Sequence, residues 1–336
     1  MEYLKKIEAF GQAIAKAERF AIITHIHPDG DALGSSCAMV HYLRSLGKTE
    51  ITLVCEEFPQ TIAFIGRNCS PVQGDAAQKA ILNADMVIIT DFSRFSRSED
   101  MESALTGTRA FKVMLDHHPS PESDKVNIAF CRTEVSSASE IVYYVLKDLC
   151  RDENERTRLM GGDCGFCLMS GMTTDTDNFS FSTWPSTLQM ASELLAYGVD
   201  RKEIISNLYN KYRCNRVEAI SWFLSNKLTI RPDGLAYILV SKEDWKRFDL
   251  MEGELEGLVN IPMSIGEVKM SIYFREDEEN TIRVSIRAKE GWSASDIAGK
   301  WFNGGGHVLA SGGKLHIPQD IASLEDIPDY LKKIKI

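Results

Sequence analysis

The sequence predicts an α/β fold in which a mainly parallel sheet of about five strands carries helices on both faces, followed by a smaller α+β domain. Two observations predict this arrangement. In the first half, the apolar runs are continuously hydrophobic, which is typical of strands covered on both faces, and helical segments alternate with them. In the second half, strand-like segments joined by turn signals replace that alternation, which is typical of hairpins. The strand-like runs of the first half lie at 19–25, 50–56, 84–91 and 110–118.

The helices and turns follow from local signals. An amphipathic helix is expected over residues 1–20, a second helix ends near Gly47, and a third begins at an N-cap formed by Ser136 or Ser137. Residues 186–226 are helical in pattern throughout. Later segments predict hairpins over 228–241 and 267–289, the second turning in its acidic tip, then a short helix and the glycine-rich stretch 303–317. The expected domains are therefore a catalytic domain at 1–185, a helical connection at 186–226 and a substrate-binding domain at 227–336.

Composition narrows the class of protein. The chain of 336 residues has 44% hydrophobic residues and a net charge of −10. No apolar run approaches the roughly 18 residues that span a bilayer, and the first residues lack the apolar core of a secretory signal, so no membrane partner is expected. The acidic charge argues against extended binding of long duplex nucleic acid, which needs a basic face.

The cysteines predict a reducing compartment. Eight are scattered through apolar stretches of a long chain, which is typical of reduced thiols in the cytoplasm. Cys164 and Cys167 form a CxxC, but no second pair at zinc-finger spacing accompanies them, so buried thiols are favoured over a zinc site.

Acidic and histidine side chains follow three of the predicted strands. The segment "HIHPDGDALGSS" at 25–36 follows the first strand, an aspartate ends the third, and "DHH" ends the fourth. The carboxyl ends of parallel strands lie along one edge, where α/β proteins bind ligands. A further acidic loop is expected at 171–181. The residues expected to converge are His25, Asp29, Asp31, Asp91, His117 and Asp175.

This set of ligands favours a pair of divalent cations. Mixed carboxylates and imidazoles suit Mn²⁺, and Mg²⁺ and Co²⁺ also fit, whereas the lack of thiolates argues against structural zinc. Six ligands are too many for one ion that leaves room for a substrate, but they suit two ions that share a carboxylate. Such a pair activates water and neutralises phosphoryl oxygens, so phosphoester hydrolysis is the leading chemistry.

Other interpretations are weaker. Each aspartate taken singly is as consistent with a turn or a helix cap as with a ligand. A serine hydrolase would need a G-x-S-x-G elbow, and a dinucleotide-binding fold would need G-x-G-x-x-G; neither motif follows a predicted strand.

Five motifs together resemble the DHH phosphoesterase family. They are "HIHPDGDALGSS", "DFSRFSR" at 91–97, "LDHHP" at 115–119, "GMTTDTDNF" at 171–179 and "GGGHVLASGG" at 304–313, the last being similar to the signature of a DHHA1 domain. They occur in the family's order over nearly the whole chain. Two departures, Asn178 in place of the usual Gly and Phe92 in place of the common Thr, remove no ligand.

The resemblance implies an activity. A chain of this length with these two domains resembles the NrnA type, which hydrolyses short oligoribonucleotides (nanoRNA) exonucleolytically to mononucleotides and removes the 3′-phosphate of adenosine 3′,5′-bisphosphate. The resemblance therefore implies a cytoplasmic, manganese-dependent enzyme whose partners are short single-stranded RNA or a nucleotide. Alternatives are hydrolysis of linear or cyclic dinucleotides or polyphosphate, and a non-catalytic nucleotide sensor. The oligomeric state, including a homodimer, is left open.

The resemblance also implies roles for residues. His25 and Asp29 would hold one Mn²⁺ and Asp31, His117 and Asp175 the other, with Asp91 bridging the two. Asp116 would orient the neighbouring histidine, His117, and His118 would face the scissile phosphate as the donor to the leaving oxygen.

The second domain offers candidates for binding a phosphate. Arg283 and Arg287 share one face of a predicted strand, and successive glycines let a backbone approach a ligand closely. A flexible turn would explain the glycines equally well, but the resemblance to DHHA1 favours binding. We name this set of residues the phosphate clamp: Arg283, Arg287, Gly304, Gly305, Gly306 and His307.

Overall fold

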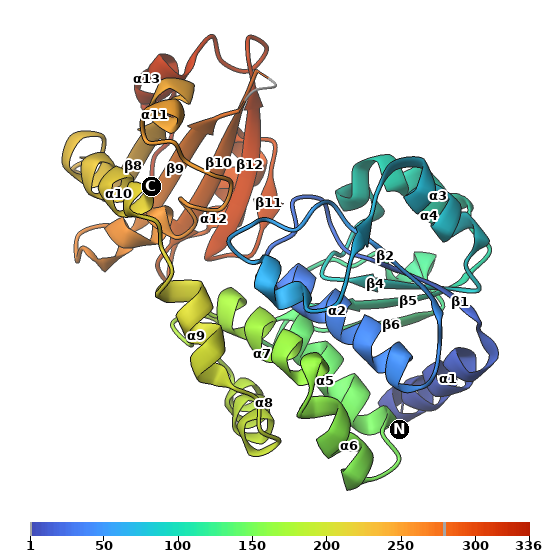
Figure 1. The fold of residues 1–336 in the computed structure, drawn as a ribbon. Helices are drawn as coiled ribbons and strands as arrows, with labels where there is room; N and C mark the ends of the chain where they lie inside the picture. Colours follow the sequence, from blue (N-terminus) through green and yellow to red (C-terminus); the bar gives the residue numbers. More distant parts are fainter. Residues whose placement is uncertain (1, 278–279) are drawn as a thin grey trace. The chain divides into compact units, whose positions relative to one another are not determined.

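The computed structural model describes residues 2–277 and 280–336. The chain divides into two compact units, Met1–Lys211 and Tyr212–Ile336, which are described separately (Figure 1). The division falls inside the segment 186–226, for which the sequence predicts a helical connection.

The first unit is built on a six-stranded, entirely parallel sheet with the strand order β3-β2-β1-β4-β5-β6. The predicted α/β class and parallel sheet are confirmed. Two short strands, β3 and β6, lie at the edges and were not predicted. The strands are β1 (Arg19–Ile23), β2 (Glu50–Val54), β3 (Pro71–Val72), β4 (Met86–Thr90), β5 (Phe111–Asp116) and β6 (Ile128–Cys131).

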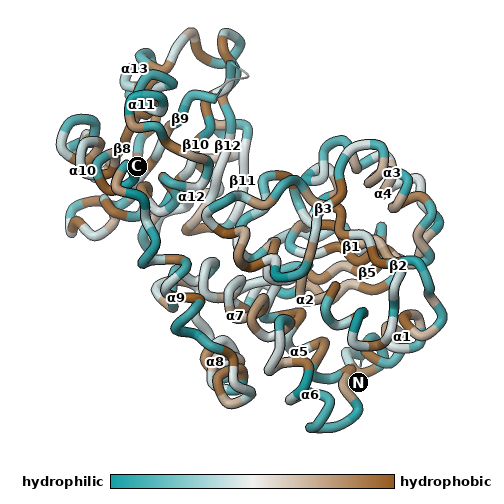
Figure 2. The backbone as a smooth tube through the Cα atoms, in the orientation of Figure 1, coloured by the Kyte–Doolittle hydropathy of each residue, from teal (hydrophilic) through white to brown (hydrophobic). Residues whose placement is uncertain are grey.

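Both faces of this sheet are buried, which explains the continuous hydrophobicity of its strands. Along β1, Phe20 and Ile22 join one apolar core while Ala21 and Ile23 join another. Figure 2 shows these strands as brown, apolar segments. The first core includes α1 (Glu2–Lys16), α2 (Gly30–Ser45), α5 (Ala138–Leu149) and α7 (Asp163–Asp175), and the second includes α3 (Gly74–Asn83) and α4 (Glu102–Gly107).

Helices α2 and α7 cross in direct backbone contact. A Cβ atom on Gly34 would lie 2.7 Å from the carbonyl oxygen of Cys167 and 2.7 Å from the Cα of Gly171. The crossing therefore requires glycine at position 34. The remaining helices of the first unit are α6 (Glu153–Met160), α8 (Pro185–Ala196) and α9 (Arg201–Tyr209).

The second unit contains a mixed six-stranded sheet in the order β11-β12-β10-β9-β8-β7. Strands β8 and β9 are parallel and the other neighbours are antiparallel, so both predicted hairpins form. The acidic tip of the second hairpin includes residues 278–279, which lie outside the described residues. The strands are β7 (Thr229–Ile230), β8 (Leu235–Val240), β9 (Met270–Glu276), β10 (Thr281–Ala288), β11 (Gly305–Gly306) and β12 (Ala310–His316).

Helices cover both sides of this second sheet. Ile282, Val284 and Ile286 of β10 share a core with residues of α12 (Ala294–Trp301) and α13 (Ile327–Leu331). Ile238 and Tyr273 share another with α10 (Cys214–Asn226) and the 3-10 helix η4 (Leu258–Ser264). A further short helix is α11 (Lys242–Arg247). Nowhere in the described part of the chain is a helix both long enough and apolar enough to span a bilayer.

Candidate metal centre and phosphate clamp

The order of the first sheet reverses between β1 and β4. Strands β2 and β3 lie on one side of β1 and strands β4 to β6 on the other, so the chain leaves the ends of β1 and β4 in different directions. In parallel sheets this point of reversal is where ligands bind. The predicted metal ligands lie on the segments that follow β1, β4 and β5 and on the neighbouring helix α7.

The segment after β1 is held in a specific shape. His27 has a positive φ of 52°, and Glu56, just beyond β2, accepts a hydrogen bond from its backbone N–H at 2.6 Å. Asp29 is the N-cap of α2, where its Oδ1 accepts from the backbone N–H groups of Asp31 and Ala32. Its other oxygen, Oδ2, lies 4.0 Å from His25 Nε2.

Asp31 is fixed by the start of another helix. Its Oδ2 accepts from the backbone N–H of Ala138 at 2.6 Å, and its Oδ1 accepts from that of Ser139 at 2.9 Å. Both donors belong to the first turn of α5, where N–H groups have no partner within the helix. The carboxyl is buried, and burial together with the charges of Asp91 and Asp175 raises its pKa well above the usual value.

Asp91 lies at the centre of the site. It follows β4 with a positive φ of 63°, and its N–H donates to the carbonyl of Leu115. Its Oδ2 lies 3.4 Å from His25 Nε2, and its Oδ1 lies 3.4 Å from His117 Nε2. Burial would raise its pKa, but the imidazoles of His117 and His25 hold the pKa well below the usual value. Among the described residues, none gives this buried Oδ1 a well-formed hydrogen bond.

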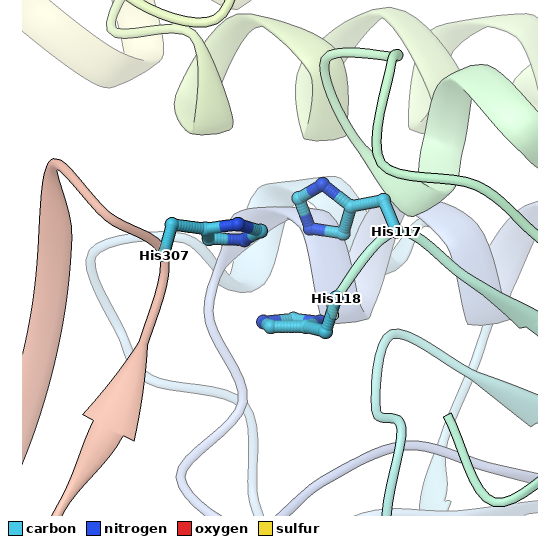
Figure 3. Close-up of side chains that lie close together, drawn as sticks. All are labelled: His117, His118 and His307. Carbon is cyan, nitrogen blue, oxygen red and sulfur yellow. The ribbon is translucent and has the colours of Figure 1, made fainter. Parts of the chain in front are cut away.

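His117 and His118 follow β5 directly and project from one loop, as Figure 3 shows. Their rings pack edge to face, with centroids 4.7 Å apart. His117 Nε2 also lies 3.6 Å from Asp175 Oδ2 and 3.9 Å from Asp31 Oδ2. Burial would lower the pKa of His117, but the charges of Asp175 and Asp91 raise it to about 10. The positive charge of the protonated ring offsets the charges of the carboxylates that face it.

Asp116 contacts His118, whereas the resemblance implied that it orients the adjacent His117. Its Oδ1 lies 2.8 Å from His118 Nδ1, and its Oδ2 accepts from the backbone N–H of His118 at 3.2 Å. The reason is the turn after β5, which brings the side chain two residues on back to the fully buried carboxylate. Because a carboxylate accepts, Nδ1 of His118 carries the proton.

Asp175 is the last residue of helix α7, although the sequence predicted a loop at 171–181. The helix was missed because its interior carries glycine and β-branched threonine, which weaken the local signal. Burial, more than any neighbouring charge, raises the pKa of Asp175 to about 7.

The donor atoms form three groups in the first unit that could each hold an ion. Within each group the candidate ligand atoms lie within 4.8 Å of one another. Asp91 belongs to two of them, and the whole set lacks thiolates. The buried, under-satisfied oxygen of Asp91 is a donor atom that suits a cation. The groups are His25–Asp29–Asp91, Asp31–His117–Asp175 and Asp91–Asp116–His118.

In the second unit the two arginines of the clamp are only partly buried and lie on one face of β10. Arg283 pairs with Asp277 and also with Glu252, at 3.3 Å from Nη1 to Oε1. Arg287 donates from Nη1 to the carbonyl of Ile286 at 3.0 Å. The arginines therefore already have partners.

The glycines of the clamp have a packing role. A Cβ on Gly304 would lie 2.0 Å from the carbonyl oxygen of Gly312. Gly305 and Gly306 pair with β12, and Gly306 has a φ of 139°. His307, also labelled in Figure 3, begins a tight turn in which its N–H donates to the carbonyl of Ala310 at 2.8 Å. Close backbone approach thus explains Gly304 and Gly306 without a ligand, whereas a Cβ on Gly305 would meet nothing within 4 Å.

Several residues that position the ligands were missed from the sequence. Glu56 holds the loop after β1, the N–H groups of Ala138 and Ser139 bind Asp31, and Gly34 permits the helix crossing. Their partners lie far away in the chain, so no local pattern indicates them.

Family models match both units. The DHH family, N-terminal domain, matches residues 19–172, and the DHHA1 domain matches residues 235–335.

Known proteins resemble the chain over nearly its full length. It is 29% identical to a probable bifunctional oligoribonuclease and PAP phosphatase NrnA of Streptococcus mutans, over 97% of this chain and 99% of that one. It is 27% identical to the bifunctional oligoribonuclease and PAP phosphatase NrnA of Bacillus subtilis, over 87% and 88%. The crystal structure of an exopolyphosphatase-related protein from Bacteroides fragilis is 31% identical, with a TM-score of 0.86, over 98% and 96%. The chain thus belongs to the DHH/DHHA1 family of phosphoesterases, and within that family to the NrnA type.

Proposed function

We propose that the protein is a metal-dependent phosphoesterase that hydrolyses short oligoribonucleotides to mononucleotides and removes the 3′-phosphate of adenosine 3′,5′-bisphosphate. The observation that carries the chemistry is the position of Asp91, whose two oxygens face His25 and His117 respectively. The substrates are proposed from relatives, which are named as oligoribonucleases and PAP phosphatases.

Two Mn²⁺ ions are the proposed cofactors, and the donor set also suits Mg²⁺ and Co²⁺. His25 and Asp29 would hold one ion, Asp31, His117 and Asp175 the other, and Asp91 both. Cations held there would neutralise phosphoryl oxygens. They would also lower the pKa of a water molecule, so that it can attack phosphorus as hydroxide. The residues themselves keep the ligand atoms in place, since Asp31 is fixed by α5 and Asp91 by the end of β4.

His118 is the proposed proton donor to the leaving oxygen. The hydrogen bond from Nδ1 to Asp116 fixes the orientation of the ring. Nε2, on the far side of the ring, would then deliver its proton to the leaving nucleotide. Asp116 acts here as a positioning residue.

The clamp in the second unit is proposed to bind a terminal phosphate. Arg283 and Arg287 present guanidinium groups on one face of β10, and a guanidinium matches the geometry of a phosphate. An anion that binds Arg283 competes with Glu252 and Asp277. This competition favours a dianionic terminal phosphate over the singly charged phosphates within a chain.

We also propose a cytoplasmic location. All eight cysteines are free thiols, and a reducing compartment maintains thiols in that state.

Hydrolysis assays with defined substrates test the proposal. The metal-stripped protein is offered an RNA of about three nucleotides, one of about twenty, adenosine 3′,5′-bisphosphate and polyphosphate, with and without Mn²⁺. We expect turnover only with metal, and at least about tenfold higher kcat/KM for the short RNA, because the acidic chain offers no extended basic track.

Each outcome has a clear meaning. Equal efficiency on short and long RNA would contradict the substrate class. Cleavage of polyphosphate alone would favour the activity named for the Bacteroides fragilis relative. Nucleotide binding without turnover under any metal would indicate a sensor.

A further inference from the structure

A second cluster of reactive side chains lies in the first unit, apart from the proposed metal ligands. Cys37 and His41 are one turn apart on α2, and Cys69 lies on the turn that follows the 3-10 helix η1 (Ala63–Gly66). Cys37 is fully buried, whereas Cys69 is partly exposed. The sulfur of Cys69 lies 3.7 Å from His41 Nε2.

Side chains of α2 hold the turn that carries Cys69. Asn68 has a positive φ of 55°, and the N–H of Cys69 donates to the carbonyl of Gly66 at 2.9 Å. Arg44 Nη1 donates to the carbonyl of Asn68 at 2.6 Å, and His41 Nε2 lies 2.8 Å from the carbonyl of Arg67. Because a carbonyl only accepts, Nε2 of His41 carries a proton, and this N–H lies beside the Cys69 sulfur.

These contacts stabilise a thiolate at Cys69. The neighbouring Cys37 thiol, more than any other group, lowers the pKa of Cys69 to about 5; burial opposes the shift, and His41 and Arg44 add to it. The proximity of Cys69, together with burial, raises the pKa of Cys37 well above the usual value. The titratable and charged groups around the sulfur are Cys37, His41 and Arg44 of α2, Cys164, Cys167 and Asp163 of α7, and Arg67 of the turn itself.

We propose that Cys69 is a site of reversible oxidation by hydroperoxides, and that Cys37 completes the modification by forming a disulfide with it. The Cys69 thiolate attacks the terminal oxygen of the hydroperoxide, the O–O bond breaks, and the products are a sulfenic acid and an alkoxide that takes a proton from solvent. The Cys37 sulfur then attacks the sulfenic sulfur, and the Cys37 proton and the hydroxide leave as water. Sulfur loses two electrons and the peroxide gains them.

The other cysteines lack this environment. Burial raises the pKa values of Cys55, Cys131, Cys150 and Cys164, which makes those thiols less reactive. Cys214 is exposed and lies on the second unit. Its exposure makes Cys214 an internal reference, since reagents reach it easily.

The first experiment measures alkylation of the intact protein by iodoacetamide at pH 6 and pH 8, with the rate at each cysteine read by mass spectrometry. An ordinary exposed thiol slows roughly tenfold per pH unit below its pKa. We expect the rate at Cys69 to change less than about threefold. Replacement His41→Phe should restore a steep pH dependence at Cys69. Equal pH dependence at Cys69 and Cys214 in the unmodified sequence would overturn the proposal.

The second experiment treats the protein with hydrogen peroxide and maps disulfides without reduction. A link between Cys37 and Cys69, reversed by a dithiol, is expected in the unmodified sequence. In Cys37→Ala, which also removes the group that most lowers the pKa of Cys69, the sulfenic acid should form more slowly but persist and be trapped by a cyclic dione, whereas Cys69→Ser should give neither product. Absence of the link in the unmodified sequence overturns the role of Cys37, whether or not the variants fold. Neither experiment depends on the proposed hydrolase activity.

Discussion

The two candidate sites differ in how their charges are balanced. Around Asp91 in the first unit, several buried carboxylates face one another, and the nearest positive groups are histidines that must be protonated to help. On β10 of the second unit, Arg283 is already paired with Asp277 and Glu252 at a half-exposed surface. Cations would therefore offset the repulsion between the carboxylates of the first site. At the second site, the charge of Arg283 is already balanced by the two carboxylates that pair with it.

This difference indicates which substitutions should lower activity most. Removing a charge from the buried site should weaken its binding of cations, and the low dielectric of the interior strengthens this electrostatic effect. Removing an arginine from the half-exposed site weakens binding, but water screens the loss.

The largest effect is expected for Asp91→Asn. The amide keeps the size of the side chain but removes the charge that both ions would share, so kcat should fall at least about 1,000-fold while the circular dichroism spectrum is retained. Asp85→Asn is the matched control, because Asp85 lies at the opposite end of β4 and pairs with Arg19. Near-normal turnover by a folded Asp91→Asn protein would refute the bridging role.

The second prediction separates His118 from His117. His118→Ala should lower kcat about 100- to 10,000-fold and leave the stoichiometry of bound Mn²⁺, measured by calorimetry, unchanged. His117→Ala should lose metal as well as activity, since its Nε2 faces three carboxylates. If both variants lost metal equally, the division of roles between them would be wrong.

A third, smaller effect is expected for Asp116→Asn. The amide no longer gives His118 Nδ1 a carboxylate acceptor, so the ring is held less firmly and kcat should fall about 10- to 100-fold with KM and metal binding kept. The specific readout is this split between the kinetic constants, measured by steady-state kinetics. An unchanged kcat, or an equal loss in kcat and metal binding, would contradict the positioning role of Asp116.

The smallest effects are expected in the clamp. Arg287→Ala should raise KM about tenfold with little change in kcat. Arg283→Ala should do the same and also cost some stability, because it removes one of the two arginines, Arg275 and Arg283, that pair with Glu252 and Asp277. Arg247→Ala, an exposed arginine on α11, is the matched control. If neither clamp variant changed KM, the proposal that the phosphate clamp binds substrate would be contradicted.

Much of the fold was predictable because its signals are local. Strands buried on both faces show as apolar runs, and a proline–aspartate–glycine turn marks the first hairpin. Strand β3 was missed because Pro71–Val72 is too short to form a pattern. Strand β6, Ile128–Cys131, was missed because it is also short and follows a polar loop. Helix α7 was missed because its helical character depends on packing against α2, which a local pattern does not record.

The candidate ligands were found for a related reason. Each one directly follows an apolar run or lies in a motif, so the topology of a parallel sheet brings His25, Asp91 and His117 together. The bond of Asp116 to His118 was not predictable, because adjacent residues compete for one carboxylate and only the backbone turn decides between them.

The crossing of α2 and α7 bears on which ions the first unit accepts. Asp31 lies less than one turn before Gly34 on α2, and Asp175 about one turn after Gly171 on α7. A Cβ on Gly171 would itself meet Asp31 Oδ1 at 3.1 Å. The gap between the two carboxylates is thus set by two helix backbones in contact and cannot widen as a loop could. Ca²⁺ needs longer bonds to oxygen than Mg²⁺ does, so this crossing is expected to discriminate against ions of large radius.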